Sequence, residues 1–495
     1  MLPSDRSAGL TLQISAPDPM TELFVVNADL QLVDRGVGRL TTKPLPPGIY
    51  RVKSRIGEET REQYVALSQP GQTLTLPPFN FASSTVLDNT SKTHEYQMGG
   101  AYRESRRVHL TRGKGSAIFV FARDWTGPGS SARPLPSPES AAAGLSLLDS
   151  NGRLIADLGT DASVVNELNG DRYSACNIAL NPGPYRLAVD LPNGTRLEQS
   201  LIACQGWQTQ AFLLRRDVDN ERRERRPDLT KASILMAASG MGFTPDDVQA
   251  RRSEIARFAL ASERSIAQDE LRQLLEDKFD NPMFGILGGH LLLLNLAPGE
   301  PPGIDLLRRV VSNLRMLVGP SHPDVEALAL ACGDPTPYQF VLPPMLRRSW
   351  AQVVTHTIEN PALVPQGSVS ADAASHVLED NPWLVWASRN ADDNARARLE
   401  RNIASALRSA MNPAPVVPPT GALPAAFAAV EKLRLQKAAR QDKPSAPRRF
   451  DMQSALSTSV NTVGNLVRKF GLPRANVESM LRSTKFDEED RNGNS

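Results

Sequence analysis

The sequence predicts a multidomain protein, β then α: two small antiparallel β-sandwich modules followed by an α-helical bundle and a partly disordered helical tail. Three observations lead to this prediction. A β-rich segment occurs twice, 135 residues apart; apolar and polar residues alternate up to about residue 214; and apolar residues recur at helical spacing beyond residue 229. A chain of 495 residues is too long for one core and predicts about three domains.

The repeated segment begins with Pro-Gly-x-Tyr-Arg and keeps its spacing without a gap. The first copy runs from Pro47 to Gly71 and the second from Pro182 to Gly206. Proline presets φ and glycine can take a positive φ, so each Pro-Gly pair predicts a turn that opens a strand. The duplication therefore predicts two copies of one module.

The first module is expected at residues 8–80. Leu10, Leu12 and Ile14 alternate with polar residues, which is the pattern of a half-buried strand. Strands are also expected on either side of Gly57. The following residues, 81–106, are mostly polar and are expected to form an irregular linker.

The second module is expected at residues 107–214. It opens with the apolar strand Ser116 to Asp124, and Asn151-Gly152 predicts a hairpin turn. The Pro/Ser/Gly-rich insert from Thr126 to Ser140 reads as a surface loop. Residues 215–228 then mix arginines with acidic residues, which favours a solvated linker over a nucleic-acid patch.

The two modules resemble the PEGA and carboxypeptidase-regulatory (transthyretin-like) β-sandwiches. The resemblance rests on the Pro-Gly-x-Tyr-x-Val strand start at Pro47 to Val52, and it covers about 70 residues of each copy. It implies a binding or spacing module and brings no catalytic residues with it.

Residues 229–410 are expected to form an α-helical domain. Thr244-Pro245-Asp246-Asp247 and Asn281-Pro282 are helix starts, because a capping side chain precedes a proline at the first helical position. Apolar periodicity predicts helices over 265–279, 282–296, 304–318, 323–331, 344–358 and 391–410. Short connectors between them favour antiparallel neighbours in a bundle or short stack.

The C-terminal residues divide into a proline-rich spacer, 411–424, and a basic helical tail, 425–495. Residues 425–485 hold 12 Lys and Arg against 4 Asp and Glu, a net charge of +8. Leu466 to Leu481 resembles a helix-turn-helix. In such motifs the early second helix faces base edges, so nucleic-acid or partner contact is predicted for Arg468, Lys469, Arg474 and Asn476. A helical hairpin that docks on a protein explains the same pattern.

Catalytic and metal-binding candidates are few. No two of the six histidines have the close helical spacing of a zinc site, and no Cys-x-x-Cys occurs, so neither a metal nor a cofactor is expected. Gly288-Gly289 beside His290 predicts close helix packing. Cys332 and His322 lack a local feature that would activate a thiol. Trp383 and Trp386, read as one helical face, are expected in the core or as interface anchors.

Part of the helical region resembles uncharacterised bacterial proteins encoded beside caspase-like peptidases. The resemblance rests on the segment Asn281 to Leu292 and on His322-Pro323-Asp324-Val325, and it covers about residues 240–335. Because those proteins have no assigned chemistry, it implies a cellular context only.

Composition sets the remaining limits. The formal net charge of +2 implies no strongly charged partner for the whole chain. Three cysteines and charged residues at Asp5 and Arg6 predict a cytoplasmic protein without a secretory leader, and the longest apolar run is too short for a membrane span. We therefore expect a non-enzymatic adaptor or scaffold that binds one or more proteins, among them a caspase-like protease. The alternative is a DNA-binding regulator that uses the tail.

Overall fold

The structure is a computed structural model with two compact units. Residues 1–356 and 362–391 form the first unit, and residues 357–361 and 392–495 form the second. The residues that the structure describes are 9–17, 20–57, 59–79, 83–86, 97–124, 140–166, 172–219, 224–245, 248–264, 266, 268–296, 301–334, 337–378, 381–389, 393–411 and 462–481.

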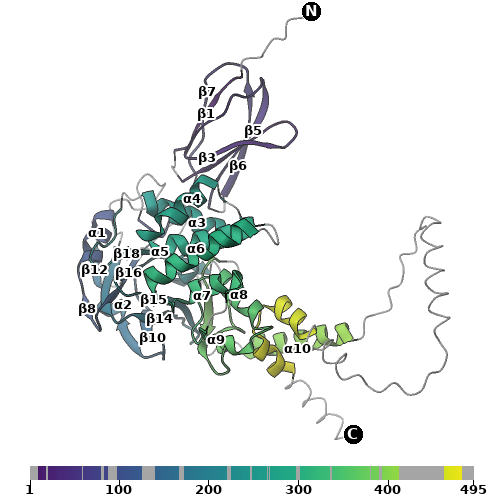
Figure 1. Cartoon of the computed structure of the whole chain (residues 1–495). Coiled ribbons are helices and arrows are strands. Elements are labelled where there is room, and N and C mark those ends of the chain that lie inside the picture. The colour runs from purple at the N-terminus through teal and green to yellow at the C-terminus, as the bar shows by residue number, and fades with distance from the viewer. Residues whose placement is uncertain are drawn as a thin grey trace, which may run out of the picture. The chain divides into compact units, whose positions relative to one another are not determined.

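The first module forms a single seven-stranded sheet in the order β6-β5-β2-β3-β4-β1-β7, drawn in purple in Figure 1. Its two end strands are therefore β6 and β7. Its strands are β1 (Leu12–Ser15), β2 (Glu22–Val26), β3 (Leu32–Val37), β4 (Arg39–Thr41), β5 (Gly48–Ile56), β6 (Glu59–Leu67) and β7 (Gln72–Thr75).

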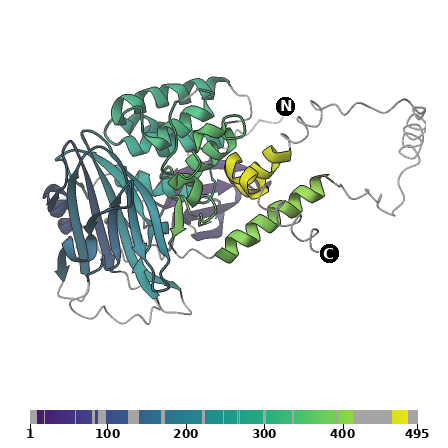
Figure 2. The same ribbon diagram turned by 90° about the horizontal axis from the view of Figure 1, so that it is seen from below.

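The second module forms two sheets, with strand orders β11-β10-β14-β15-β19 and β12-β13-β9-β16-β17. Figure 2 shows their long strands running side by side, in blue to teal. Up to residue 227 the strands are β8 (Leu110–Thr111), β9 (Ser116–Asp124), β10 (Leu145–Asp149), β11 (Leu154–Asp157), β12 (Ser163–Asn166), β13 (Arg172–Leu180), β14 (Gly183–Asp190), β15 (Arg196–Ala203), β16 (Trp207–Asp219) and β17 (Glu224–Pro227).

The duplication extends to the strand pairing. In the first module β1 pairs in parallel with β7 and antiparallel with β4, while β2 pairs with β3 and β5, and β5 with β6. In the second module β9 pairs in parallel with β16 and antiparallel with β13, while β10 pairs with β11 and β14, and β14 with β15. Strand β6 thus corresponds to β15.

Two segments expected to be linkers contain regular structure. Within 81–106, residues 98–106 form helix α1 (Met98–Arg106), and residues 83–86 are buried. Within 215–228, β16 continues to Asp219 and pairs with β17. The charged residues of this segment form ion pairs, such as Arg225 with Asp124 on β9 and Arg216 with Asp228 within the segment. The linker prediction is wrong for both.

Helices follow the sheets, as predicted. Asn281 caps α5 by accepting a hydrogen bond from the Met283 amide, as its Asn-Pro pair predicts. The helical segments are α2 (Leu158–Asp161), η2 (Leu229–Lys231), α3 (Val248–Ala261), α4 (Gln268–Glu276), η3 (Asp277–Phe279), α5 (Pro282–Asn295), α6 (Pro301–Val318), α7 (Pro323–Ala331), α8 (Arg347–His356), η4 (Pro361–Leu363), α9 (Val369–Ala373) and α10 (Asp393–Met411).

The region predicted to be a separate helical domain, 229–410, also supplies strands to the sheets. Strand β18 (Ser233–Ala238) pairs with β16, and β19 (Val385–Ser388) pairs with β15. One buried apolar cluster accordingly joins side chains of both sheets to those of the helices, among them Phe121, Leu187 and Leu287. The sheets and the helices therefore share one core.

None of the described helices combines the length and the apolar character that a membrane crossing requires. Although α5 is buried along most of its length, it has only 14 residues.

The second unit contains α10 and two further helices, at 462–470 and 474–481. Gly471 lies between them with φ of +64°, a left-handed conformation that favours glycine. Val467, Val477 and Met480 are buried, in agreement with the predicted pair of amphipathic helices. The spacer after Met411 and the basic segment up to residue 461 lie outside the described residues.

Candidate functional site

A strand from beyond the helices completes the second module. Strand β19 adds antiparallel to β15, with Leu197 opposite Ala387 and Gln199 opposite Val385. Its residues lie almost 200 positions after β15 in the chain. Strand β15 therefore acts as an acceptor edge that is filled by a distant segment of the same chain.

A buried ion pair joins β15 to β14, the next strand of the sheet on the side away from β19. Arg186 on β14 donates through Nη1 to Oε2 of Glu198 on β15, at 2.8 Å. Ser388 of β19 donates its hydroxyl to the other oxygen of Glu198. Because both carboxylate oxygens are satisfied, the charge of Glu198 is compensated although the residue is only 3% exposed.

The two predicted anchor tryptophans, Trp383 and Trp386, lie just before and within β19. Trp386 lies opposite Glu198 in the β19 ladder, and Trp383 donates its indole N–H to the carbonyl of Ala232 at 2.6 Å. Both are 1% exposed. They belong to an extended segment and not to a helix, so the prediction of a shared helical face is wrong. The contacts that they anchor are therefore contacts within the chain itself.

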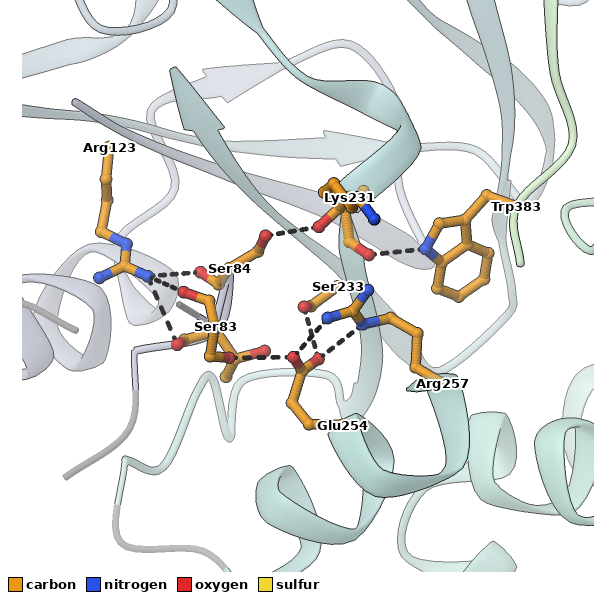
Figure 3. A network of polar contacts seen from close by, with 10 residues as sticks. Ser83, Ser84, Arg123, Lys231, Ser233, Glu254, Arg257 and Trp383 are labelled. Carbon is orange, nitrogen blue, oxygen red and sulfur yellow. Dashed lines mark hydrogen bonds and ion pairs between the residues drawn. The ribbon is translucent and has the colours of Figure 1, made fainter. Parts of the chain in front are cut away.

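A polar network fixes the segment that joins the two modules (Figure 3). Arg123 on β9 donates to the carbonyls of Ser83 and Ser84, at 2.6 and 2.9 Å. The Ser83 hydroxyl donates to Glu254 on α3 at 3.0 Å, and Arg257 donates to both oxygens of Glu254. All five residues are buried. These side chains hold the junction in place.

A second buried cluster joins α5, α7 and α8. The Asp324 carboxylate accepts the amide protons of Met345 and Leu346, each at 2.9 Å. Ser349 also hydrogen-bonds to Asp324 and lies 2.8 Å from Nε2 of His290. Burial raises the pKa of Asp324 to about 6 and lowers that of His290 to about 3. This cluster brings an acid, a hydroxyl and an imidazole group together, and all three residues are buried.

The cysteines and His322 have no environment that would activate a nucleophile. Burial raises the pKa of Cys176 and of Cys204 to about 12 and that of Cys332 to about 11. Burial also lowers the pKa of His322 to about 3. Within the described ranges, no three His, Cys, Asp or Glu residues lie close enough together to hold a metal ion.

A cleft of about 330 Å³ opens beside β18 and η3. Trp207 and Phe243 line its interior, and the exposed side chains Met241 and Phe279 lie at its rim. Its lining contains neither histidine nor cysteine. The lining mixes these apolar side chains with the polar residues Gln210, Thr244, Asp280 and Asn281.

The predicted contact residues of the tail lie on the two C-terminal helices. The Arg474 guanidinium is bonded to Glu478 and to the carbonyl of Ile358, so it is already engaged within the second unit. Arg468 lies 3.5 Å from Asn465 at the surface, and Lys469 lies over the Phe470 ring. The backbone N–H of Asn476 donates to the carbonyl oxygen of Pro473. Arg474 and Asn476 are half-buried, whereas Arg468 and Lys469 are exposed.

Comparison with known proteins assigns no family to the chain. No protein-family model matches it, and no curated protein sequence matches it. Among solved structures, the N-terminal eight Ig domains of Down Syndrome Cell Adhesion Molecule (DSCAM) isoform 1.30.30 share 15% identity with it. The match covers 42% of this chain and 28% of that chain, with a TM-score of 0.12. So low a score assigns no fold.

Proposed function

We propose that the chain is a non-enzymatic adaptor or scaffold that binds other proteins through its β modules. Each module is, in this proposal, a small sandwich of the PEGA and carboxypeptidase-regulatory type. The bacterial, caspase-associated setting and the cytoplasmic location remain predictions from the sequence.

One observation carries the proposal: the second module binds an extended segment as an added strand. Strand β19 pairs with β15 along four residues, and its Ser388 donates to Glu198 of the Arg186–Glu198 ion pair. Main-chain pairing at an edge is a common way for proteins to recognise extended segments. A module that holds a distant segment of its own chain in this way has the surface needed to hold a segment of another.

The buried polar groups support a structural role. Glu254 and Arg257 satisfy each other, and Asp324 satisfies the amides at the start of α8. Buried polar groups of this kind fix a unique packing when all of their hydrogen bonds are made. Their positions are consistent with a rigid support for interaction surfaces.

The proposal is tested by partner capture followed by reconstitution. The tagged full-length chain is recovered from its native host, and each co-purified protein is identified by mass spectrometry and produced separately. The adaptor function predicts that at least one of them rebinds the purified chain with defined stoichiometry and keeps its intact mass. A candidate that rebinds but is cleaved or covalently altered by the chain would contradict a non-enzymatic role, and failure of every candidate to rebind would contradict the adaptor itself.

The alternative function, a DNA-binding regulator, has one structural feature in its favour. The two C-terminal helices and the glycine between them match the predicted helix-turn-helix spacing. The contacts of Arg474 with Glu478 and Ile358 weigh against it. We therefore place protein binding first.

A further inference from the structure

Strand β6 of the first module corresponds to β15, but its outer edge is open. It stands at one end of the seven-stranded sheet, and no described strand pairs with its outer side. An exposed edge offers unpaired N–H and C=O groups to any extended chain that approaches it. The same position in the second module is filled by β19.

The strand registers show which residues correspond. Gly48 pairs with Leu67, and Gly183 pairs with Ala203. The first members of the two pairs are 135 residues apart and the second members are 136 apart, so β6 matches β15 with an offset of 136. Arg51 and Glu62 thereby occupy the positions of Arg186 and Glu198.

The ion pair is present in both modules, partly exposed in the first and buried in the second. Arg51 Nη1 lies 3.3 Å from Glu62 Oε2, with 28% and 39% of the two side chains exposed. The Arg186–Glu198 pair is 2.8 Å long, with only 10% and 4% exposed. Burial of the second pair coincides with the added strand β19, whose Ser388 reaches Glu198.

Apolar side chains flank the partly exposed pair. Tyr64, which occupies the position of the buried Ser200, is 73% exposed, and Ile49 is 64% exposed. Paired residues of neighbouring strands share a face, so Tyr64 opposite Arg51 and Ile49 opposite Ala66 lie on the face that carries Glu62. Exposed apolar residues around a charged pair are typical of a surface that another chain covers.

We propose that the β6 edge accepts an extended segment of a partner protein as an antiparallel strand. The partner segment carries a bulky apolar residue opposite Glu62 and a serine or threonine two positions later. This sequence preference follows from β19, where Trp386 lies opposite Glu198 and Ser388 donates to that carboxylate. The inference rests on the proposed adaptor function and names the surface that performs it.

The experiment uses the full-length chain and a synthetic peptide of sequence Trp-Leu-Val-Trp-Ala-Ser-Arg-Asn, which is residues 383–390. Binding is followed by calorimetry, and the site is located by amide hydrogen exchange. We expect slower exchange in residues 59–67 and unchanged exchange in β15. Tyr64→Ala is expected to weaken binding about tenfold, as loss of a central aromatic contact does. Tyr102→Ala, which removes an exposed tyrosine from α1, serves as the matched control and leaves binding unchanged.

Three results would overturn the inference: no binding at millimolar peptide, protection outside β6 only, or equal affinity for Tyr64→Ala and the unaltered chain. Self-association of the chain through β6 that excludes the peptide would also overturn it, because the occupant would then be a second copy. The adaptor proposal is judged separately. A captured partner that still binds Tyr64→Ala with full affinity refutes the β6 site and leaves the adaptor function standing.

Discussion

The hydroxyl of Tyr50 donates a hydrogen bond to the carbonyl oxygen of Pro46, at 2.8 Å. The repeat places the same bond in the second module, where Tyr185 donates to the carbonyl of Asn181 at 2.9 Å. In both cases the tyrosine reaches back four residues, across the Pro-Gly pair at which its strand begins. The repeated sequence therefore encodes a repeated local contact that fixes how the chain enters β5 and β14.

Loss of this bond should weaken the first module. Tyr50→Phe keeps the ring and removes the hydroxyl, so we expect the free energy of unfolding to fall by about 1 kcal/mol, the usual net value of one hydrogen bond. Tyr64→Phe is the control, because its hydroxyl lies on the exposed face of the same sheet. Urea unfolding of the full chain measures both. Equal stability of the two variants would contradict a role for the Tyr50–Pro46 bond.

The junction network should be far more sensitive than a surface ion pair of the same spacing. Glu254→Gln leaves the Arg257 charge buried without its partner, for which we expect a loss of about 3–5 kcal/mol. Asp305→Asn removes the exposed Asp305–Arg308 pair, also three residues apart on one helix, and should cost less than about 1 kcal/mol. Thermal unfolding compares the two. Similar losses would show that the network in Figure 3 does not hold the junction.

Local patterns predicted local structure well. The Asn281-Pro282 helix start and the turn at Gly471 follow from single residues whose backbone preferences are strong. The order of sheets before helices follows from the change of apolar period at about residue 229. These features depend on neighbours in sequence, which a pattern of spacing records directly.

Long-range pairing could not be predicted in the same way. Val385 and Trp386 form a strand because β15 lies beside them, and nothing within a few residues of them encodes that partner. The register of β6 on β5 differs by one residue from that of β15 on β14, because the two connecting loops leave different numbers of residues unpaired. The repeat in the sequence runs without a gap and therefore shows no sign of this difference. The candidate site therefore required the structure.

Asp324 should make stability fall as the pH rises from about 4 to about 6. Burial raises its pKa from the ordinary 3.8 to about 6, so in this window the folded state keeps a proton that the unfolded state has lost. The stabilisation is fully present below about pH 4 and is lost as the pH passes about 6. Two pKa units correspond to roughly 3 kcal/mol.

This pH effect is isolated by subtraction. The free energy of unfolding is measured for the unaltered chain and for Asp324→Asn at intervals between pH 4 and 7. The pKa of His322 is lowered mainly by its own burial, which both proteins share, so most of its contribution drops out of the difference. As the pH rises, we expect the free energy of unfolding of the unaltered chain to fall by roughly 3 kcal/mol relative to that of Asp324→Asn. A constant difference would show that Asp324 is not titrating in the packed interior.

The added strand should depend on Trp386. Replacing this buried side chain by alanine leaves a large cavity opposite Glu198, and we expect a loss of about 3–5 kcal/mol together with faster amide exchange in β15. Met316→Ala, at an exposed position on α6, should change stability by less than about 0.5 kcal/mol. If β15 exchanges no faster in Trp386→Ala, the tryptophan does not hold β19 in place.

The adaptor account predicts that Arg468 and Lys469, on the first of the two C-terminal helices, do not contribute to DNA binding. The double variant Arg468→Glu with Lys469→Glu and the control Arg398→Glu on α10 should shift a generic DNA duplex to the same small extent as the unaltered chain, at low and high salt. A salt-sensitive shift that only the double variant loses would instead favour the regulator, because phosphate contacts release counterions.

The most direct test of the account is amide hydrogen exchange in residues 59–67 of the full-length chain, measured with and without a partner that rebinds after capture. We predict that β6 exchanges rapidly in the free chain and becomes protected in the complex, as an edge strand does when another strand adds to it. A stable complex in which β6 exchanges as fast as in the free chain would contradict the claim that this open edge is where the protein holds its partner.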